Sequence, residues 1–388
     1  MEHERSSNLE QHSRSYWKGI FVKLKHLAPS AAILAVGALT LSACGGGSAT
    51  GEEISEGGNS DLQGTITGIG ASSQKAAMDA WTADFASANS GMTVNYSPDG
   101  SGAGREQFLA GNAQFAGSDA HLDEEEVEAS KEVCGPEGAF EYPVYISPIA
   151  VAFNVEGVDE LNLSPSTIAK IFKGEISTWN DEAIKADNPD ADLPDTKITA
   201  VHRSDDSGTT ENFAEYLKAT AEKDWDAEVS GNFPKEFGGE AAKGTDGVVQ
   251  TISDTDGAIG YADASAVGSL GKAKVKVGEE FVELSPEAAS KVVDASEQVE
   301  GRGEGDLAFD LARDTTESGA YPIVLVSYHL VCSSYKDQET VDMVKAWEKF
   351  VVSEEGQKSA AESAGSAPLS DDLRSQIETV IDSIKVEG

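Results

Sequence analysis

The sequence is poor in basic residues, and this shortage narrows the functions that it can carry. Its 388 residues include 29 Lys and Arg against 68 Asp and Glu, a formal charge of −39. Nucleic-acid binders need basic patches to displace counterions, so this class is excluded. Docking on anionic lipid through a basic face is disfavoured for the same reason. Binding of a small anion stays possible, because a pocket acts through hydrogen-bond donors at contact distance.

Histidine and cysteine are also scarce, with six and three residues. Only His121, His202 and His329 lie beyond the N-terminal segment, which is few for a metalloenzyme or an acid–base enzyme. Long apolar runs are missing as well. The run from Ala31 to Leu41 falls short of the ~20 residues that a transmembrane helix needs.

The N-terminal segment has the order of an export signal. Basic residues precede the short apolar run, and small residues follow it, ending at Cys44. The tetrapeptide Leu41–Cys44 resembles the lipobox of bacterial lipoproteins, which implies cleavage before Cys44 and lipidation of its sulfur. We therefore expect a signal peptide over 1–43, then a lipidated cysteine and flexible linker over 44–62. The alternatives are an ordinary signal peptide or an uncleaved anchor.

Two cysteines remain in the body, Cys134 and Cys332. Exported proteins fold in an oxidising compartment, so one disulfide is predicted, with two buried free thiols as the alternative. The body is also longer than the ~250–300 residues at which a single core stops growing. The chain should therefore form two domains, or one body with two lobes.

Hydrophobic patterning predicts alternating strands and helices, which is typical of an α/β fold with mostly parallel sheets. One helix should bury Ala77, Met78, Trp81 and Phe85 on one face, and another should begin at Arg105. Strands are expected over 64–70, 92–96, 114–117, 144–154, 198–202, 257–261 and 323–331, and further helices over 164–172, 210–218, 341–352 and 371–384.

Three strand-to-helix junctions place small or hydroxyl residues where a helix begins. They are Ser72–Ser73, Ser101–Gly102 and Ser207–Thr209. A helix N-terminus offers unpaired N–H groups, and Ser and Thr add hydroxyl donors. Each junction alone is explained by ordinary helix capping. Converging at the carboxyl edge of the sheets, the three would form an anion cradle.

Charged residues beside these junctions favour a particular anion. Arg203 offers a fork of N–H donors, and Asp205 is placed to pair with it, or to serve only as a turn residue. Asp119 follows another strand end. Phosphate keeps a proton near neutral pH and can donate it to a carboxylate, whereas sulfate has none to donate. A carboxylate acceptor in the pocket would therefore select phosphate over sulfate.

These residues lie within a wider resemblance. The body, about residues 63–388, resembles the phosphate-binding lipoproteins (PstS-type substrate-binding proteins) of bacterial high-affinity phosphate ABC transporters. Two stretches, Arg203–Thr209 and Trp179–Ile184, are the most specific. Ser73 departs from the family, which often has an aromatic residue there, and His202 stands where an Arg is frequent. The other matching segments are Gly68–Ser72, Tyr96–Gly104, Phe115–Ala120, Ile171–Gly174, Gly244–Gly247, Gly257–Tyr261 and Ala367–Leu369.

The resemblance implies a type II periplasmic-binding-protein fold, with two lobes that close about a hinge. Lobe one would combine 63–148 with 322–388, lobe two would span 149–321, and each would hold a mixed, mostly parallel sheet. Phosphate would bind without a cofactor or metal, and the partners would be the ABC permease and its ATPase. A monomer anchored through Cys44 on the extracytoplasmic membrane face is implied. The implied phosphate-binding residues are Ser72, Ser73, Ser101, Asp119, Arg203, Asp205, Ser207, Gly208 and Thr209.

Other classes of function stay open at this point. An exported phosphatase or serine hydrolase would use Ser101 or Ser207 as its nucleophile, although neither has the Gly-x-Ser-x-Gly spacing. A binder of sulfate or molybdate would meet uncompensated carboxylates at Asp119 and Asp205. An adhesin or sensor with the same fold cannot be told from a transport protein by sequence, because fold does not fix function.

Overall fold

The computed structural model describes residues 62–388. The predicted signal peptide and Cys44, with all of the linker but Leu62, lie outside the described residues. Among the helices of 62–388, none has both the length and the hydrophobicity needed to cross a membrane.

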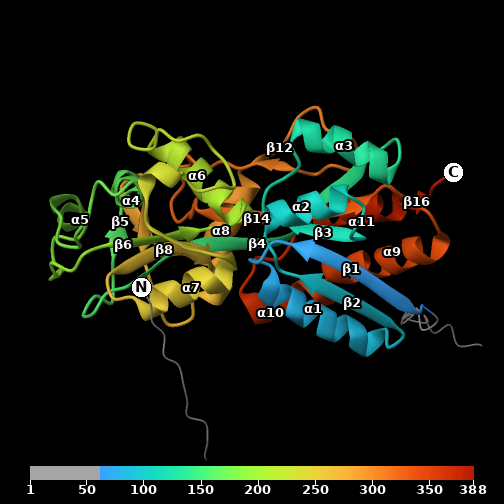
Figure 1. Ribbon diagram of the computed structural model, residues 1–388, viewed down its shortest axis with the longest axis horizontal. Helices are drawn as coiled ribbons and strands as arrows, with labels where there is room; N and C mark the ends of the chain where they lie inside the picture. Colours follow the sequence, from blue (N-terminus) through green and yellow to red (C-terminus); the bar gives the residue numbers. More distant parts are fainter. Residues whose placement is uncertain (1–61) are drawn as a thin grey trace, which may run out of the picture. The chain divides into compact units, whose positions relative to one another are not determined.

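One group of parallel strands, drawn blue to cyan in Figure 1, begins the body. β1 pairs in parallel with β2 on one side and β3 on the other, and β14 runs antiparallel beside β3. The parallel strands are β1 (Gly64–Gly70), β2 (Met92–Ser97) and β3 (Phe115–Ser118), and the antiparallel strand beside them is β14 (Val324–Cys332). Their helices are α1 (Lys75–Ala88), α2 (Ser101–Leu109), α3 (Glu124–Cys134), α9 (Gln338–Val352), α10 (Glu354–Ala364) and α11 (Asp371–Ser383).

A second group of strands, green to yellow in Figure 1, comes from the middle of the chain. β6 pairs in parallel with β7 and with β8. The strands are β6 (Thr199–Arg203), β7 (Glu240–Ala242) and β8 (Ala258–Asp263). The helices around them are α4 (Pro165–Phe172), α5 (Glu182–Asp187), α6 (Gly208–Thr220), α7 (Gly244–Asp254) and α8 (Pro286–Asp294).

A single long strand, β4 (Ala139–Asn154), joins the two groups. Its first part, to Pro148, pairs antiparallel with β14, and its second part, from Ile149, pairs antiparallel with β8. Within residues 62–388 the strands thus form one sheet path in the order β2-β1-β3-β14-β4-β8-β6-β7. Figure 1 shows β4 running between the two halves. Below, lobe one denotes the half with β1 and lobe two the half with β6.

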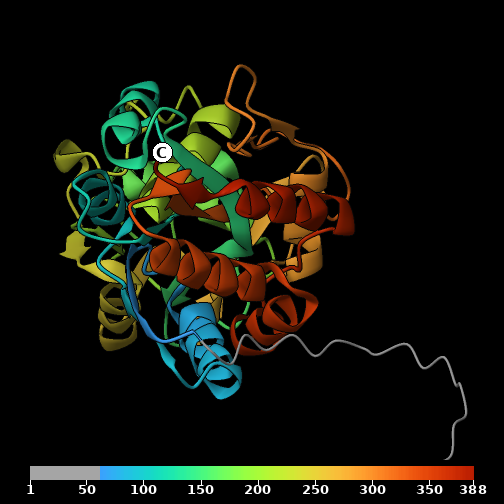
Figure 2. The same ribbon diagram turned by 90° about the vertical axis from the view of Figure 1, so that its right-hand side faces the viewer.

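Packing follows the hydrophobic pattern of the sequence. The predicted face of α1, formed by Ala77, Met78, Trp81 and Phe85, is buried. Phe85 lies edge-on to Trp347 of α9, with ring centroids 5.3 Å apart. Helices α9 and α11, red in Figure 2, lie side by side over lobe one. The C-terminal segment therefore completes a core that the N-terminal strands begin.

The element boundaries differ from the predicted ones in two informative places. Helix α2 begins at Ser101, four residues before the predicted start at Arg105. Helices α3, α5, α7, α8 and α10 were not predicted. The buried face of α10 consists of Gly356, Gln357, Ala360 and Ala364 and carries no large apolar side chain. The sheet is also more mixed than a mostly parallel one, since β4 and β14 are antiparallel to their neighbours.

Cys134 and Cys332 form a disulfide, as predicted. The bond joins the end of α3 to the end of β14, so both half-cystines belong to lobe one. The two cysteines are 198 residues apart in the sequence, so the bond ties the C-terminal part of lobe one to its N-terminal part. Such a cross-link stabilises mainly by restricting the unfolded chain, and more so when the loop is long.

We expect the double substitution Cys134→Ser with Cys332→Ser to lower the free energy of unfolding by about 2–5 kcal/mol. Urea unfolding followed by tryptophan fluorescence measures this change. Reductant should destabilise the unaltered chain by a similar amount and leave the double variant unchanged. Equal stability of the oxidised chain and the double variant would contradict the prediction.

Candidate functional site

A buried carboxylate, that of Asp119, lies at the centre of the candidate site. It directly follows β3, and only 3% of the residue is exposed. Its Oδ1 accepts hydrogen bonds from the hydroxyls of Ser73 (2.6 Å) and Ser327 (2.5 Å). Its Oδ2 accepts one from Thr209 of α6 (2.9 Å). Asp119 thus connects hydroxyls of lobe one with a hydroxyl of lobe two.

The first predicted junction lies between β1 and α1. Because α1 begins at Lys75, Ser72 and Ser73 occupy the turn before the helix. The Ser72 hydroxyl lies 3.0 Å from that of Thr245, and the Thr245 N–H donates to it at 3.1 Å. Thr245 belongs to the first turn of α7, so Ser72 touches lobe two directly.

The second junction lies between β2 and α2. Gly100 precedes the helix with φ of 109°, a conformation that favours glycine, and its N–H donates to Gly70 O (2.9 Å). This turn places Ser101 as the first helical residue, where its hydroxyl accepts from the N–H of Asp119 (3.1 Å). The second junction therefore holds the backbone of Asp119 in place.

The third junction lies between β6 and α6, in lobe two. Ser207 caps α6 by accepting from the N–H of Thr210 at 3.3 Å. Gly208 follows at a point of close approach: a Cβ added there would lie 2.7 Å from the Cβ of Asp119 and 2.8 Å from the Ser101 hydroxyl. Glycine is required here by space, and the structure brings the three junctions together around Asp119.

Arg203 ends β6 beside the third junction and is 4% exposed. Its Nε and Nη2 donate to the two carboxylate oxygens of Asp205, at 2.8 and 2.5 Å. The Gly244 N–H also donates to Asp205, at 3.1 Å. Burial alone would raise the pKa of Asp205, but these donors and the charge of Arg203 hold it below its ordinary value. Asp205 is therefore a charged partner that orients the guanidinium.

Several residues at this site were not identified from the sequence. Thr245 meets Ser72, and Ser327 meets Asp119. Asn212 donates from its side chain to the carbonyl oxygens of Asp119 (2.7 Å) and Gly208 (2.8 Å). The only signal for Thr245 was its place in the Gly244–Gly247 segment. Ser327 lies inside a long apolar strand, and nothing nearby in the sequence marks it.

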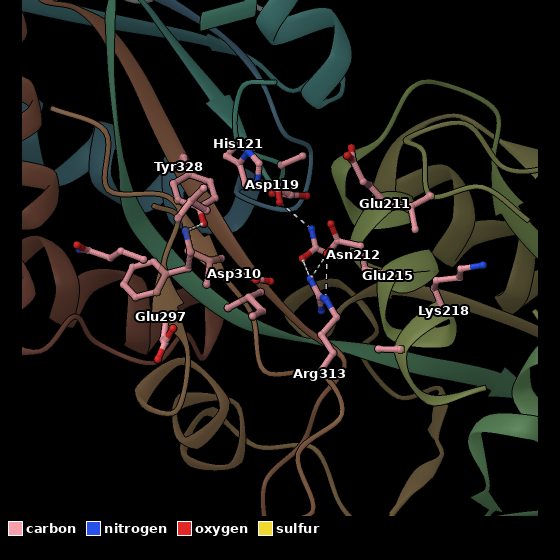
Figure 3. A pocket seen from close by; sticks show the side chains of 18 of the residues that line it. Asp119, His121, Glu211, Asn212, Glu215, Lys218, Glu297, Asp310, Arg313 and Tyr328 are labelled. Atoms are coloured by element: carbon pink, nitrogen blue, oxygen red, sulfur yellow. Dashed lines mark hydrogen bonds and ion pairs between the residues drawn. The ribbon is translucent and has the colours of Figure 1, made fainter. Parts of the chain in front are cut away.

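A cavity of about 720 Å³ adjoins Asp119 between the lobes, and Figure 3 shows its lining. Arg313 projects into it and donates to Glu215 (2.9 Å) and to the side-chain oxygen of Asn212. It also donates to Val324 O of β14 at 3.0 Å. Arg313 thereby links α6 of lobe two to the strand that leads back to lobe one.

Comparison with known proteins places the chain in a family. Residues 55–355 match the model described as the PBP superfamily domain. Phosphate-binding protein PstS3 of Mycobacterium bovis is 34% identical over 94% of this chain and the whole of the relative. Phosphate-binding protein PstS of Xylella fastidiosa is 33% identical over 81% of this chain and 84% of its own length. The chain belongs to the PstS family of the PBP superfamily.

Solved structures support the same fold for this PstS-family chain. A high-affinity periplasmic phosphate-binding protein, solved with phosphate bound, matches with a TM-score of 0.65 at 21% identity. The match covers 81% of this chain and 93% of the solved one. The two-lobed periplasmic-binding-protein fold expected from the sequence is confirmed. These relatives are binding proteins, which does not support the enzymatic alternatives.

One titratable side chain that lines the cavity has a strongly shifted pKa. Burial raises the pKa of Glu211, in the first turn of α6, to about 7. Arg105 of α2 lowers it, whereas the negative charges of Glu215, Asp206 and Glu126 raise it further. The lobes therefore meet through an acidic cluster in which Arg105 offsets only part of the repulsion.

This shift predicts that stability falls as pH rises. The folded chain holds the Glu211 proton to about pH 7, whereas the unfolded chain releases it near its ordinary pKa of 4.5. The folded state therefore binds more protons between these values, and stability decreases across that window. Glu211→Gln removes the titration, so it should stabilise the chain above pH 7, on the order of 1–3 kcal/mol, and leave stability near pH 4 unchanged.

Urea unfolding at several pH values between 4 and 8 measures this difference. Glu362→Gln is a suitable control, because that side chain is 71% exposed and forms an ion pair with the exposed Lys358 at 3.7 Å. A stability difference between Glu211→Gln and the unaltered chain that does not change with pH would refute the assignment.

Proposed function

We propose that the chain binds inorganic phosphate between its lobes and delivers it to an ABC permease. One observation carries the proposal: a buried carboxylate, Asp119, accepts hydrogen bonds from hydroxyls of both lobes, and Arg203, at the third junction, is oriented by Asp205. Donors match an oxyanion, and a carboxylate acceptor matches an oxyanion that still carries a proton. Phosphate near neutral pH has both properties. The names of the relatives point to the same ligand.

Each predicted site residue has a role in this proposal. Ser72 and Ser101 offer hydroxyls and N–H groups, Ser207 offers its hydroxyl, and Ser73, Gly208 and Thr209 offer N–H groups. The Thr209 hydroxyl donates to Asp119. Asp119 accepts the phosphate proton. Arg203 donates from its guanidinium, and Asp205 keeps that fork in place. The closeness of Gly208 to Asp119 supports this set, because it brings the α6 N-terminus within reach of lobe one.

The proposed division into lobes follows the strand pairing. We assign 63–148 and 322–388 to lobe one and 149–321 to lobe two. The change of partner along β4 at Pro148 and Ile149 supports the first boundary, and the bond from Ile149 N to Ile323 O (2.7 Å) supports the second. Phosphate would close the lobes by a hinge motion. The ion pair between Lys243 and Asp99 (3.1 Å) joins the two lobes and would be lost when they open.

The proposal includes the setting of the protein. The signal peptide over 1–43, a lipid on Cys44 and the linker over 44–62 would hold a monomer on the extracytoplasmic face of the cell membrane. Its partners would be the permease subunits and their ATPase. The order of basic, apolar and small residues before Cys44 supports the anchor.

Calorimetry on the anion-free chain tests the ligand and the role of Asp119 together. At neutral pH we expect one phosphate per chain and no heat with sulfate. In Asp119→Asn the amide can donate to a sulfate oxygen, so the preference for phosphate should fall by about tenfold or more. Asp123→Asn, a change at the N-cap of α3, should keep the preference. An unchanged preference in Asp119→Asn would exclude this role, and absence of phosphate heat in the unaltered chain would exclude the function.

Arg203 should contribute more to binding than any single hydroxyl. Arg203→Ala removes a charged fork of donors and should weaken phosphate binding more than Ser72→Ala, by at least about tenfold relative to it. Arg203→Lys keeps the charge but loses the fork and should fall between the two. Circular dichroism checks that each variant is folded. Equal losses in Arg203→Ala and Ser72→Ala would contradict the ranking.

A further inference from the structure

A buried chain of side-chain hydrogen bonds leads from Asp119 into the core of lobe one. Ser327 lies 2.5 Å from Oδ1 of Asp119, and Gln74 Nε2 lies 2.7 Å from the Ser327 hydroxyl. Gln74 Oε1 lies 3.3 Å from Nε2 of His329, and Nδ1 of His329 lies 2.8 Å from Glu348. All five residues are buried, and His329 and Glu348 have no exposed surface.

Strand register explains how these residues meet. Tyr328 of β14 pairs with Ser118 and His329 with Gly117, so the antiparallel run places Ser327 next to Asp119. Ser327 and His329 are two residues apart and therefore share a face of the strand. The pairing of β14 with β4 shifts between Ser327 and Tyr328, an irregularity of the kind that re-aims a side chain.

The donors and acceptors give this chain one direction. The Gln74 amide nitrogen donates both to Ser327 and to Tyr328 O (3.3 Å), so the Ser327 hydroxyl hydrogen is left for Asp119. The Gln74 amide oxygen can only accept, so Nε2 of His329 must donate to it. Each hydrogen bond of the series then points toward the carboxylate.

His329 and Glu348, at the end of the series away from Asp119, determine this direction. With a hydrogen on Nε2, His329 meets Glu348 through Nδ1, and the 2.8 Å distance requires one proton between the two atoms. The imidazole is enclosed by aromatic rings: those of Phe115 and Trp81 lie 5.2 and 6.1 Å away, centroid to centroid. Glu348 therefore orients His329, His329 orients the Gln74 amide, and the amide orients Ser327.

We propose that Ser327, oriented by Gln74, His329 and Glu348, is a positioning residue that sets the anion specificity of Asp119. The inference rests on the proposed function and adds to it. Ser73 and Ser327 fill both acceptor positions of Oδ1, and Thr209 fills one of the two on Oδ2. One acceptor position is left, which suits one proton of phosphate.

The same bonds hold the carboxylate of Asp119 in one orientation. In that orientation it accepts the proton of phosphate, whereas an anion without a proton meets only acceptor oxygens. Loss of Ser327 should let the carboxylate turn, which weakens its hydrogen bond with phosphate and lessens the repulsion of sulfate, a change that loss of packing does not produce.

Calorimetry with phosphate and with sulfate on the full chain tests this inference. Ser327→Ala should lower the preference for phosphate by about tenfold or more, the effect expected from losing one hydrogen bond to a charged group. Ser327→Thr retains the hydroxyl and should restore the preference. In an Asp119→Asn background Ser327→Ala should cause no further loss, because the two act through one contact.

Matched variants separate positioning from structure. Ser130→Ala removes another buried hydroxyl of lobe one, bonded to Val127 O and Ala139 N, and should leave the preference unchanged. In Gln74→Glu a carboxylate oxygen replaces the amide nitrogen and competes with Asp119 for the hydroxyl hydrogen of Ser327. This variant keeps Ser327 and should still lower the preference for phosphate over sulfate. It decides the question if Ser327→Ala does not fold.

The outcomes distinguish this inference from the proposed function. An unchanged preference in Ser327→Ala, or an equal loss in Ser130→Ala, overturns the positioning role alone. A folded, unaltered chain that binds no phosphate overturns the proposed function and this inference with it. Loss of preference through rising sulfate affinity, restored by Ser327→Thr, supports both.

Discussion

The acceptor capacity of one buried carboxylate organises the site. Asp119 lies at the end of β3, where it would be an unpaired buried charge without donors, and a buried charge without partners is costly. Two hydroxyls from lobe one and one from lobe two satisfy it. The hydrogen bond from Thr209, one of the three that offset this cost, therefore also joins the lobes. In the proposed function, contact between the lobes and recognition of the anion would depend on the same group of bonds.

Much of this arrangement could be predicted from the sequence. Hydrophobic runs gave the principal strands, and the apolar face of α1 was identified residue by residue. The three junctions were recognisable because each combines Ser or Thr with a following helix. Gly208 was grouped with them for its backbone N–H, whereas its role in close approach emerged only from the fold. Site residues could thus be predicted from the sequence where a single short segment contains the whole pattern.

The remaining contacts depend on pairing between distant segments. Ser327 lies 208 residues from Asp119, and only the register of β14 against β3 brings them together. Thr245 and Asn212 are likewise ordinary helical residues until α7 and α6 dock against lobe one. Helix α10 escaped notice because small residues form its buried face. Long-range register and small-residue packing leave no periodic pattern in a single sequence.

The strand that joins the lobes also bears on how a loaded protein is told from an empty one. Ser327 lies on β14, beside the stretch of β4 that passes from one lobe to the other. A bend there would shift the hydroxyl that Ser327 donates to Oδ1 of Asp119. With the proposed hinge at this stretch, the angle between the lobes and the fit of the anion would depend on each other. A partner that contacts both lobes would then respond to the shape that only an anion carrying a proton produces.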